Sequence, residues 1–241
     1  MLIRQFGDFK RKLPNCAIRH VLDIGANVGD TVAQTVQHFP NAAVDAFEPV
    51  QATFRRLSER FAKQSQIKCH NFAMGALPGQ AQITAIGTET GNEIVSSAPD
   101  GVPVETIAVL TGDDFVKSAG IDRVSFLKID TEGFDLKVLQ GFAHMLAQQK
   151  IDIFQVEVGM GRQNTKHVAL QSIQQFAEAN NYWLFKLYDQ AHELDGRPLL
   201  RRADAVFISA ACMNANIMPD QRPRVKRHPP LMKKWISALL R

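Results

Sequence analysis

The most regular feature of this sequence is an alternation of short apolar runs with segments whose apolar residues recur every three or four positions. The run at 42–47 is almost continuously apolar, which is typical of a strand buried on both faces of a parallel sheet. The segment at 50–63 places Phe54, Leu57 and Phe61 on one side, which is typical of an amphipathic helix. The alternation predicts an α/β domain with a largely parallel sheet and helices on both faces.

The same hydrophobic pattern predicts the strands and helices along the chain. Strands are predicted at 20–24, 42–47, 67–74, 81–86, 104–110, 124–129, 151–158, 182–187 and 205–210. Helices are predicted at 30–39, 50–63, 113–119, 134–148 and 165–180. Residues 87–103, rich in Gly, Ser, Thr and Pro, favour a mobile lid or substrate loop. The predicted organisation is an N-terminal lead-in at 1–19, one domain at 20–212 and a basic tail at 213–241.

The composition suits a single globular domain with a sizeable core, since 45% of the 241 residues are hydrophobic and 22% are charged. Cys16, Cys69 and Cys212 lie far apart and show no metal-ligand spacing, so we expect reduced thiols without disulfides or zinc. No apolar run approaches the ~20 residues of a spanning helix, and the N-terminus lacks the apolar core of a signal peptide. These features predict a cytoplasmic protein.

The net charge of +4 comes from the C-terminal tail. Between 221 and 241 the chain has no acid and these cations: Arg222, Arg224, Lys226, Arg227, Lys233, Lys234 and Arg241. The rest of the chain is therefore net negative, which argues against a nucleic-acid partner. Cations beside Trp235 and Ile236 could form a short helix on anionic lipid, that is, a peripheral membrane contact. A helix docking on its own or a neighbouring subunit is the favoured alternative.

The strongest chemical signal is the stretch 21–31, V-L-D-I-G-A-N-V-G-D-T, which predicts a strand, a tight turn and a helix N-terminus. Gly25 permits close approach to the main chain, and Gly29 is expected to let the following helix pack against the sheet. The spacing is not G-x-G-x-x-G, so it does not predict a nicotinamide dehydrogenase. The form D-x-G-A-N-x-G instead resembles the first loop of S-adenosylmethionine (SAM) methyltransferases. The alternative is a generic strand–helix turn.

Two positions near the next strand ends fit the same ligand. Glu48 ends the strand at 42–47, where a carboxylate can accept hydrogen bonds from the two ribose hydroxyls of an adenosine. An acid at a strand end can equally be a capping or solvated residue. Phe72 and Ala73 close the third strand and could contact an adenine ring, or simply belong to the core.

The block 128–133, K-I-D-T-E-G, is the second strong signal, because charges at the end of an apolar strand are unfavourable unless they pair or bind a ligand. Asp130 is expected beside the sulfonium or the incoming nucleophile, and a structural pair with Lys128 is the alternative. Asp130 and Glu157 are expected to face one cleft, either to provide a general base or to bind a divalent cation, and the residues do not decide between these roles. His167 is a candidate accessory base.

In combination, the three motifs V-L-D-I-G-A-N-V-G-D-T, F-E-P and F-L-K-I-D-T-E-G-F-D-L-K-V-L-Q-G resemble the FkbM family of SAM-dependent methyltransferases over residues 18–160. The resemblance implies a class I methyltransferase (Rossmann-like) fold with a seven-stranded, mostly parallel sheet. It also implies methyl transfer, usually to oxygen, on sugars, polyketide-type natural products or lipids. Thr111-Gly-Asp113-Asp114 stands where family members often show T-L-D, which leaves the role of Asp113 open.

The sequence therefore predicts a SAM-dependent O-methyltransferase with a sugar, glycan, lipid or natural-product acceptor. The predicted cofactor-binding residues are Asp23, Gly25, Ala26, Asn27, Gly29, Thr31, Glu48, Pro49, Phe72, Ala73 and Asp130. Asp130, Glu157 and His167 are the predicted catalytic residues, and no metal site is predicted. The alternatives are a ribose 2′-O-methyltransferase of RNA and a non-catalytic SAM-binding protein. The oligomeric state does not follow from the sequence.

Overall fold

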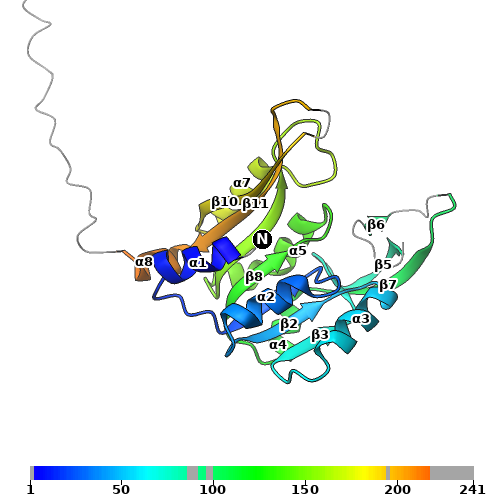
Figure 1. Cartoon of the computed structure of the whole chain (residues 1–241), viewed down its shortest axis with the longest axis horizontal. Helices are drawn as coiled ribbons and strands as arrows, with labels where there is room; N and C mark the ends of the chain where they lie inside the picture. The colour runs from blue at the N-terminus through cyan, green and yellow to red at the C-terminus, as the bar shows by residue number, and fades with distance from the viewer. Residues whose placement is uncertain (1–2, 86–91, 96–99, 194–195, 218–241) are drawn as a thin grey trace, which may run out of the picture.

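The protein is built on a seven-stranded sheet with the order β10-β11-β9-β8-β1-β2-β3 (Figure 1). The computed structural model describes residues 3–85, 92–95, 100–193 and 196–217. The strands are β1 (His20–Ile24), β2 (Ala43–Phe47), β3 (Ile67–His70), β8 (Val124–Ile129), β9 (Ile151–Gly159), β10 (Tyr182–His192) and β11 (Leu200–Ser209). All neighbours pair in parallel except β11, which is antiparallel to both β9 and β10. This topology is the class I methyltransferase fold, so the predicted fold class is confirmed.

Helices cover both faces of this sheet, because successive strand residues point to opposite sides. Val21 of β1 packs in the core beneath α1 (Ile3–Lys12), α2 (Asp30–His38) and α3 (Gln51–Phe61). Leu22 belongs to the second core. That core is covered by α4 (Gly112–Ser118), α5 (Asp135–Gly141), α6 (Ala143–Ala147) and α7 (Leu170–Ala179). The buried sheet is thus held rigidly between two helical layers, and its strand ends are fixed in space.

A second, four-stranded sheet stands beside the main one, and the sequence did not predict it as a separate sheet (Figure 1). It has the order β4-β7-β5-β6 and contains β4 (Ala73–Met74), β5 (Gly79–Thr84), β6 (Ile94–Val95) and β7 (Val104–Leu110). The predicted strand at 67–74 is therefore divided between the two sheets. Asn71 marks the division, since its side-chain amide donates to the carbonyls of Glu48 and Pro49 at 3.0 and 2.9 Å. Much of the predicted lid at 87–103 lies outside the described residues.

The predicted helix at 134–148 is also divided, and the division explains Asp113. Its carboxylate accepts the backbone N–H groups of His144 at 2.8 Å and Met145 at 3.0 Å. These N–H groups lie in the first turn of α6, where they have no partner within the helix. Asp113 therefore caps α6, which begins after α5 ends at Phe142. This is a structural role.

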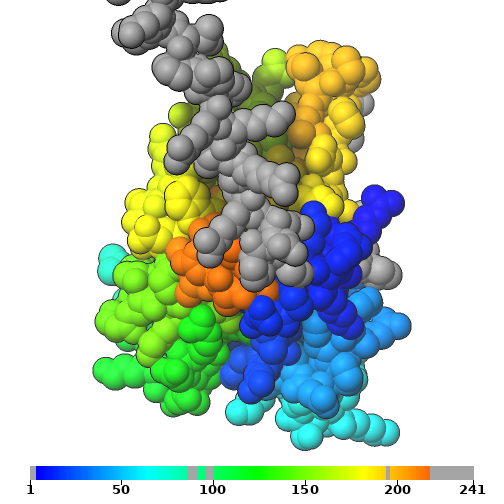
Figure 2. Space-filling model, turned by 90° about the vertical axis from the view of Figure 1, so that its left-hand side faces the viewer, coloured from blue at the N-terminus to red at the C-terminus, as the bar shows by residue number. Residues whose placement is uncertain are grey.

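The expectation that all three cysteines are reduced thiols is wrong for two of them. Cys16 and Cys212 form a disulfide across 196 positions of sequence, whereas Cys69 is free. The bond joins the lead-in after α1 to α8 (Ala210–Ala215), and these segments lie side by side in both views (Figures 1 and 2). This pairing could not be predicted from the sequence, because only the folded sheet brings the two ends of the domain together.

The basic tail predicted at 213–241 lies almost wholly outside the described residues. The same holds for its predicted helix, whether that helix contacts a membrane or docks on a subunit. Among the helices of the part that the structure describes, none is long and apolar enough to cross a membrane.

Candidate active site

A pocket opens where β1, β2 and β8 end, at the edge of the sheet where open α/β folds bind their ligands. Its lining includes seven of the predicted cofactor residues, namely Gly25, Asn27, Glu48, Pro49, Phe72, Ala73 and Asp130. The structure leaves the other predicted site residues outside the lining, namely Asp23, Ala26, Gly29, Thr31, Glu157 and His167. The pocket therefore gathers the ends of three strands around one cavity.

The turn after β1 owes its shape to two glycines with positive φ. Gly25 has φ +79°, and a Cβ there would lie 2.0 Å from the carbonyl oxygen of Asp130. Gly29 has φ +86°, and a Cβ there would meet the side chains of Leu57 and Phe61 on α3. Gly25 thus lets the loops after β1 and β8 approach each other, and the close approach at Gly29 is to α3, not to the sheet as expected. No other residue type fits either place without movement.

Glu48 joins the end of β2 to this turn. Its carboxylate accepts the backbone N–H of Asn27 at 3.0 Å and that of Val50 at 2.9 Å. Burial raises the pKa of Glu48 to about 7, although both hydrogen bonds oppose the rise. The N–H groups use one lone pair on each carboxylate oxygen, which leaves acceptor capacity toward the pocket.

A row of charges runs beneath the pocket from β1 to the loop after β8. Lys128 lies between two acids, with its Nζ 3.3 Å from both Asp23 Oδ1 and Asp130 Oδ2. Burial opposes the charge on Lys128, but the two carboxylates outweigh it and raise the pKa of the lysine. Burial raises the pKa of Asp23, and the ion pair with Lys128 opposes the rise. Lys128 therefore holds Asp130 at the pocket, and Asp23 in turn holds Lys128.

The second sheet supplies a wall that sequence reasoning missed. Ile83 of β5, Ile94 of β6 and nearby Asn92 line the same pocket as the turn after β1. The alternation at 81–86 predicted a strand, but nothing in it showed which side would face a ligand. Thr131 also lines the pocket, and its buried hydroxyl has no hydrogen-bond partner among the described residues.

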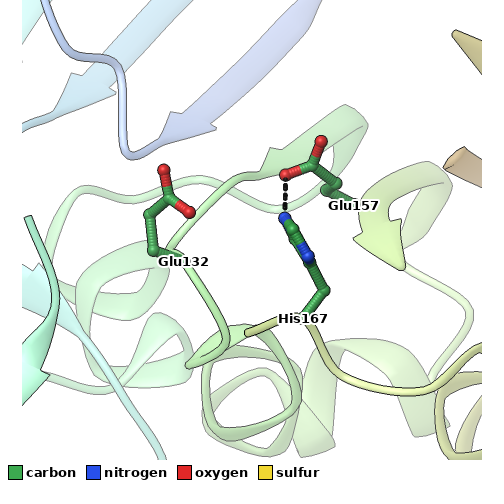
Figure 3. Close-up of side chains that lie close together, drawn as sticks. All are labelled: Glu132, Glu157 and His167. Carbon is green, nitrogen blue, oxygen red and sulfur yellow. Dashed lines mark ion pairs between the residues drawn. The ribbon is translucent and has the colours of Figure 1, made fainter. Parts of the chain in front are cut away.

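Glu157 and His167 meet beside the pocket (Figure 3). His167 Nε2 lies 2.8 Å from Glu157 Oε2, and Arg202 forms an ion pair with the other Glu157 oxygen. Burial lowers the pKa of His167, and Lys166 and Arg201 add to the effect, whereas Glu132 and Asp135 oppose it. Glu132, which the sequence analysis left without a role, lines the pocket and faces the same pair.

Asp204 is a second residue that the sequence analysis missed. It lies on β11 opposite Glu157 of β9, and Gln155 Nε2 donates to its Oδ2 at 2.9 Å. Burial raises the pKa of Asp204 to about 7, and the nearby charge of Asp130 raises it further. Asp204 directly precedes the strand predicted at 205–210, so its position could have been noticed. Only the antiparallel pairing of β11 with β9 brings it near Lys128 and Asp130. Two other histidines, His70 and His144, do not line the pocket and are hydrogen-bonded to Asp45 and Gln148.

Comparison with known proteins shows which family has this fold and motif set. Residues 23–186 match the model of the methyltransferase FkbM domain, which is well over half of the chain. The chain therefore belongs to the FkbM methyltransferase family, whose cofactor is SAM.

One curated relative is the hexuronic acid methyltransferase AglP of Haloferax volcanii, 25% identical over 151 residues. The match covers 57% of this chain and 56% of AglP, so it spans about half of that relative. Among solved structures, the methyltransferase domain of METTL16 has a TM-score of 0.48 and 13% identity, with 86% of this chain and 65% of that one covered. TrmK of M. capricolum, in complex with S-adenosylhomocysteine, has a TM-score of 0.45 and 16% identity, with 82% and 66% covered.

The pocket suits this cofactor on its own chemistry. Glu48 offers free acceptor capacity for ribose hydroxyls, and the orphaned hydroxyl of Thr131 offers a further polar contact. Phe72, Ala73 and Ile94 provide an apolar surface for a flat ring. The negative charge of Asp130 at the rim favours a cationic centre such as a sulfonium.

Proposed function

We propose that this protein is a SAM-dependent O-methyltransferase whose acceptor is a hydroxyl group of a sugar. The observation that carries the proposal is the pocket itself, where the buried carboxylate of Glu48 and the half-buried carboxylate of Asp130 line one cavity. Family membership supports methyl transfer, and the activity named for AglP supports a sugar, with a hexuronic acid as the first acceptor to test. Glycans carried on lipids and natural products with sugar units belong to the same acceptor class.

In this proposal the residues fall into three groups by position. The cofactor is held by the turn after β1 and by the ends of β2 and β4, that is, by Asp23, Gly25, Ala26, Asn27, Gly29, Thr31, Glu48, Pro49, Phe72 and Ala73. Of these, Asp23, Ala26, Gly29 and Thr31 do not line the pocket, so we propose that they act by shaping the turn. Asp130 lies beside the sulfonium and is kept there by Lys128. Glu157 and His167 stand next to the acceptor hydroxyl.

The chemistry required of these residues is positioning and removal of one proton. Bound SAM supplies an electrophilic methyl group, so the acceptor oxygen gains a bond to carbon and must lose its hydrogen. Holding the oxygen in line with the methyl group supplies most of the rate enhancement. Glu157 and His167 assist removal of this proton, which passes to the pair itself or to water as the new bond forms.

The experiment that tests the function is incubation of purified protein with methyl-labelled SAM and a panel of free and nucleotide-linked sugars, followed by mass spectrometry. We expect a mass gain of one methyl group on a hexuronic acid or related sugar, and its loss with Asp130→Asn. Transfer to total RNA instead of sugars would favour the ribose 2′-O-methyltransferase. SAM binding without transfer to any acceptor, cell extracts included, would favour a non-catalytic binding protein.

A further inference from the structure

Three potential metal ligands converge beside the pocket from three separate segments. Glu132 follows β8, Glu157 lies on β9, and His167 lies in the loop before α7. Their ligand atoms all lie within 4.8 Å of one another, and the side chains point toward a common centre (Figure 3). Glu132 also lines the pocket, so this centre borders the pocket in which the acceptor is proposed to bind.

Asn164 determines which nitrogen of His167 carries the hydrogen. Its Oδ1 accepts the backbone N–H groups of Lys166 at 3.2 Å and His167 at 3.1 Å, and its Nδ2 donates to the carbonyl of Arg201 at 2.9 Å. These bonds fix the amide orientation, so the atom 3.0 Å from His167 Nδ1 is an acceptor. His167 Nδ1 must therefore be the donor, and the neutral ring presents a lone pair at Nε2.

That lone pair faces another acceptor. His167 Nε2 lies 2.8 Å from Glu157 Oε2, and two acceptors at this distance need a proton or a cation between them. The ring is held in the way that metal-binding histidines usually are, with the second nitrogen donating to a fixed oxygen. The side chain of His167 is only 4% exposed, so the ring has little freedom to turn away.

The neighbouring basic side chains, Arg202 and Lys166, do not exclude a metal ion from this centre. Arg202 occupies Glu157 Oε1, which leaves Oε2 directed toward His167. Lys166 pairs with Glu132 Oε2 at 3.0 Å, but its side chain is 48% exposed and can return to water with little loss of free energy. Asp135 fixes the turn that presents Glu132 by accepting the N–H groups of Thr131 and Gly133 at 3.1 and 3.0 Å.

We infer that Glu132, Glu157 and His167 form a binding site for a divalent transition-metal ion such as Mn²⁺. Two carboxylates and one imidazole suit the first-row divalent metals, and three protein ligands leave open positions for oxygen ligands from water or substrate. The role of the ion in catalysis rests on the proposed function. The acceptor hydroxyl binds at an open position, where the ion lowers its pKa, and its proton passes to water as the methyl–oxygen bond forms and the methyl–sulfur bond breaks.

The direct test uses the full chain, freed of metal with a chelator and titrated with MnCl₂ by calorimetry, without SAM or acceptor. Mn²⁺ electron paramagnetic resonance gives an independent measure of the bound ion. We expect one Mn²⁺ per chain, and an affinity at least tenfold lower for His167→Ala and for Glu132→Gln. We expect Asn164→Ala, which frees the ring, to weaken binding by about tenfold to a hundredfold.

Two matched variants serve as controls. His144 is exposed and bonded through its ring to Gln148, and Glu178 is exposed on α7, so His144→Ala and Glu178→Gln should bind Mn²⁺ as the unchanged chain does. Glu132 lies at the pocket surface, so Glu132→Gln is expected to fold and carries the test if His167→Ala does not.

The outcomes separate this inference from the proposed function. No saturable Mn²⁺ binding by the unchanged chain, or equal binding by Glu132→Gln, would overturn the metal site. If such a chain still methylates sugars, the proposed function stands and the Glu157–His167 pair takes the proton directly. Mn²⁺ binding at these residues without methyl transfer to any acceptor would support the metal site and contradict the proposed methyltransferase function.

Discussion

The carboxylate of Glu48 accepts the backbone N–H of Asn27 at 3.0 Å, which ties the end of β2 to the glycine turn after β1. The second oxygen accepts the N–H of Val50 at 2.9 Å. The acid proposed to bind the ribose is therefore also the residue that holds the turn against it. Cofactor affinity and the shape of the turn should consequently change together when Glu48 is altered.

Glu48→Gln should reduce SAM affinity at least tenfold. The glutamine can keep only one of the two N–H bonds, because its amino group would face an N–H donor at the other, and hydrogen bonds to charged groups contribute about 1.5–3 kcal/mol each. Calorimetric titration with SAM measures the change. Glu178→Gln, on an exposed position of α7, is the matched control and should bind as the unchanged chain does. Equal affinity of Glu48→Gln would remove the ribose assignment.

SAM affinity should rise with pH through the pKa of Glu48, which burial raises to about 7. The ionised carboxylate accepts ribose O–H bonds, whereas the protonated acid has less acceptor capacity. Dissociation constants at about pH 6, 7 and 8 should therefore fall as the pH increases, and Glu48→Gln should remove most of this dependence. A dependence that persists in Glu48→Gln would point to another group.

The raised pKa of Glu48 should also make the stability of the ligand-free protein depend on pH, but stability should decrease as the pH rises, whereas SAM affinity increases. Because burial raises the pKa of Glu48 from its ordinary 4.5 to about 7, ionisation is harder in the folded chain than in the unfolded one. The contribution of this group to stability is greatest below pH 4.5 and decreases as the pH rises to about 7. Urea titrations over this range should show a flatter profile for Glu48→Gln.

Gly25→Ala should destabilise the fold by about 3 kcal/mol or more, since it adds both backbone strain and overlap with the Asp130 carbonyl. Gly120→Ala is the matched control, because Gly120 also has positive φ, at +68°, but no atom lies within 4 Å of its added Cβ. We expect that control to lose about 1–2 kcal/mol. Urea denaturation of both variants gives the comparison, and similar losses would show that contact with Asp130 is unimportant.

The residues that sequence reasoning placed correctly are those whose environment is local. The apolar runs at 20–24 and 124–129 identified their strands because both are buried on each face by helices. The motif around Gly25 placed the pocket, since a strand end and a helix start are properties of adjacent residues. Glu48 followed from its position directly after β2.

The residues that sequence reasoning missed depend on contacts between distant segments. Asp204 reaches the charged row only because β11 runs antiparallel to β9, and a strand pattern gives no pairing direction. The wall at Ile83 and Ile94 requires the chain to leave the main sheet after Asn71. Glu132 lay inside a recognised motif, but its meeting with His167 depends on a loop more than thirty residues later in the chain.

The disulfide between Cys16 and Cys212 should contribute to the stability of the domain and not to the pocket. A bond that closes so long a loop restricts the unfolded chain, so reduction should destabilise the domain by about 2–5 kcal/mol. Thermal unfolding with and without dithiothreitol measures the loss, and Cys16→Ser should unfold at the lower temperature in both conditions. Cys69→Ser is the control, because Cys69 is free and this variant should respond to reductant as the unchanged chain does. A peptide map under non-reducing conditions should contain the Cys16–Cys212 pair, and finding both thiols free in the folded protein would contradict the bond.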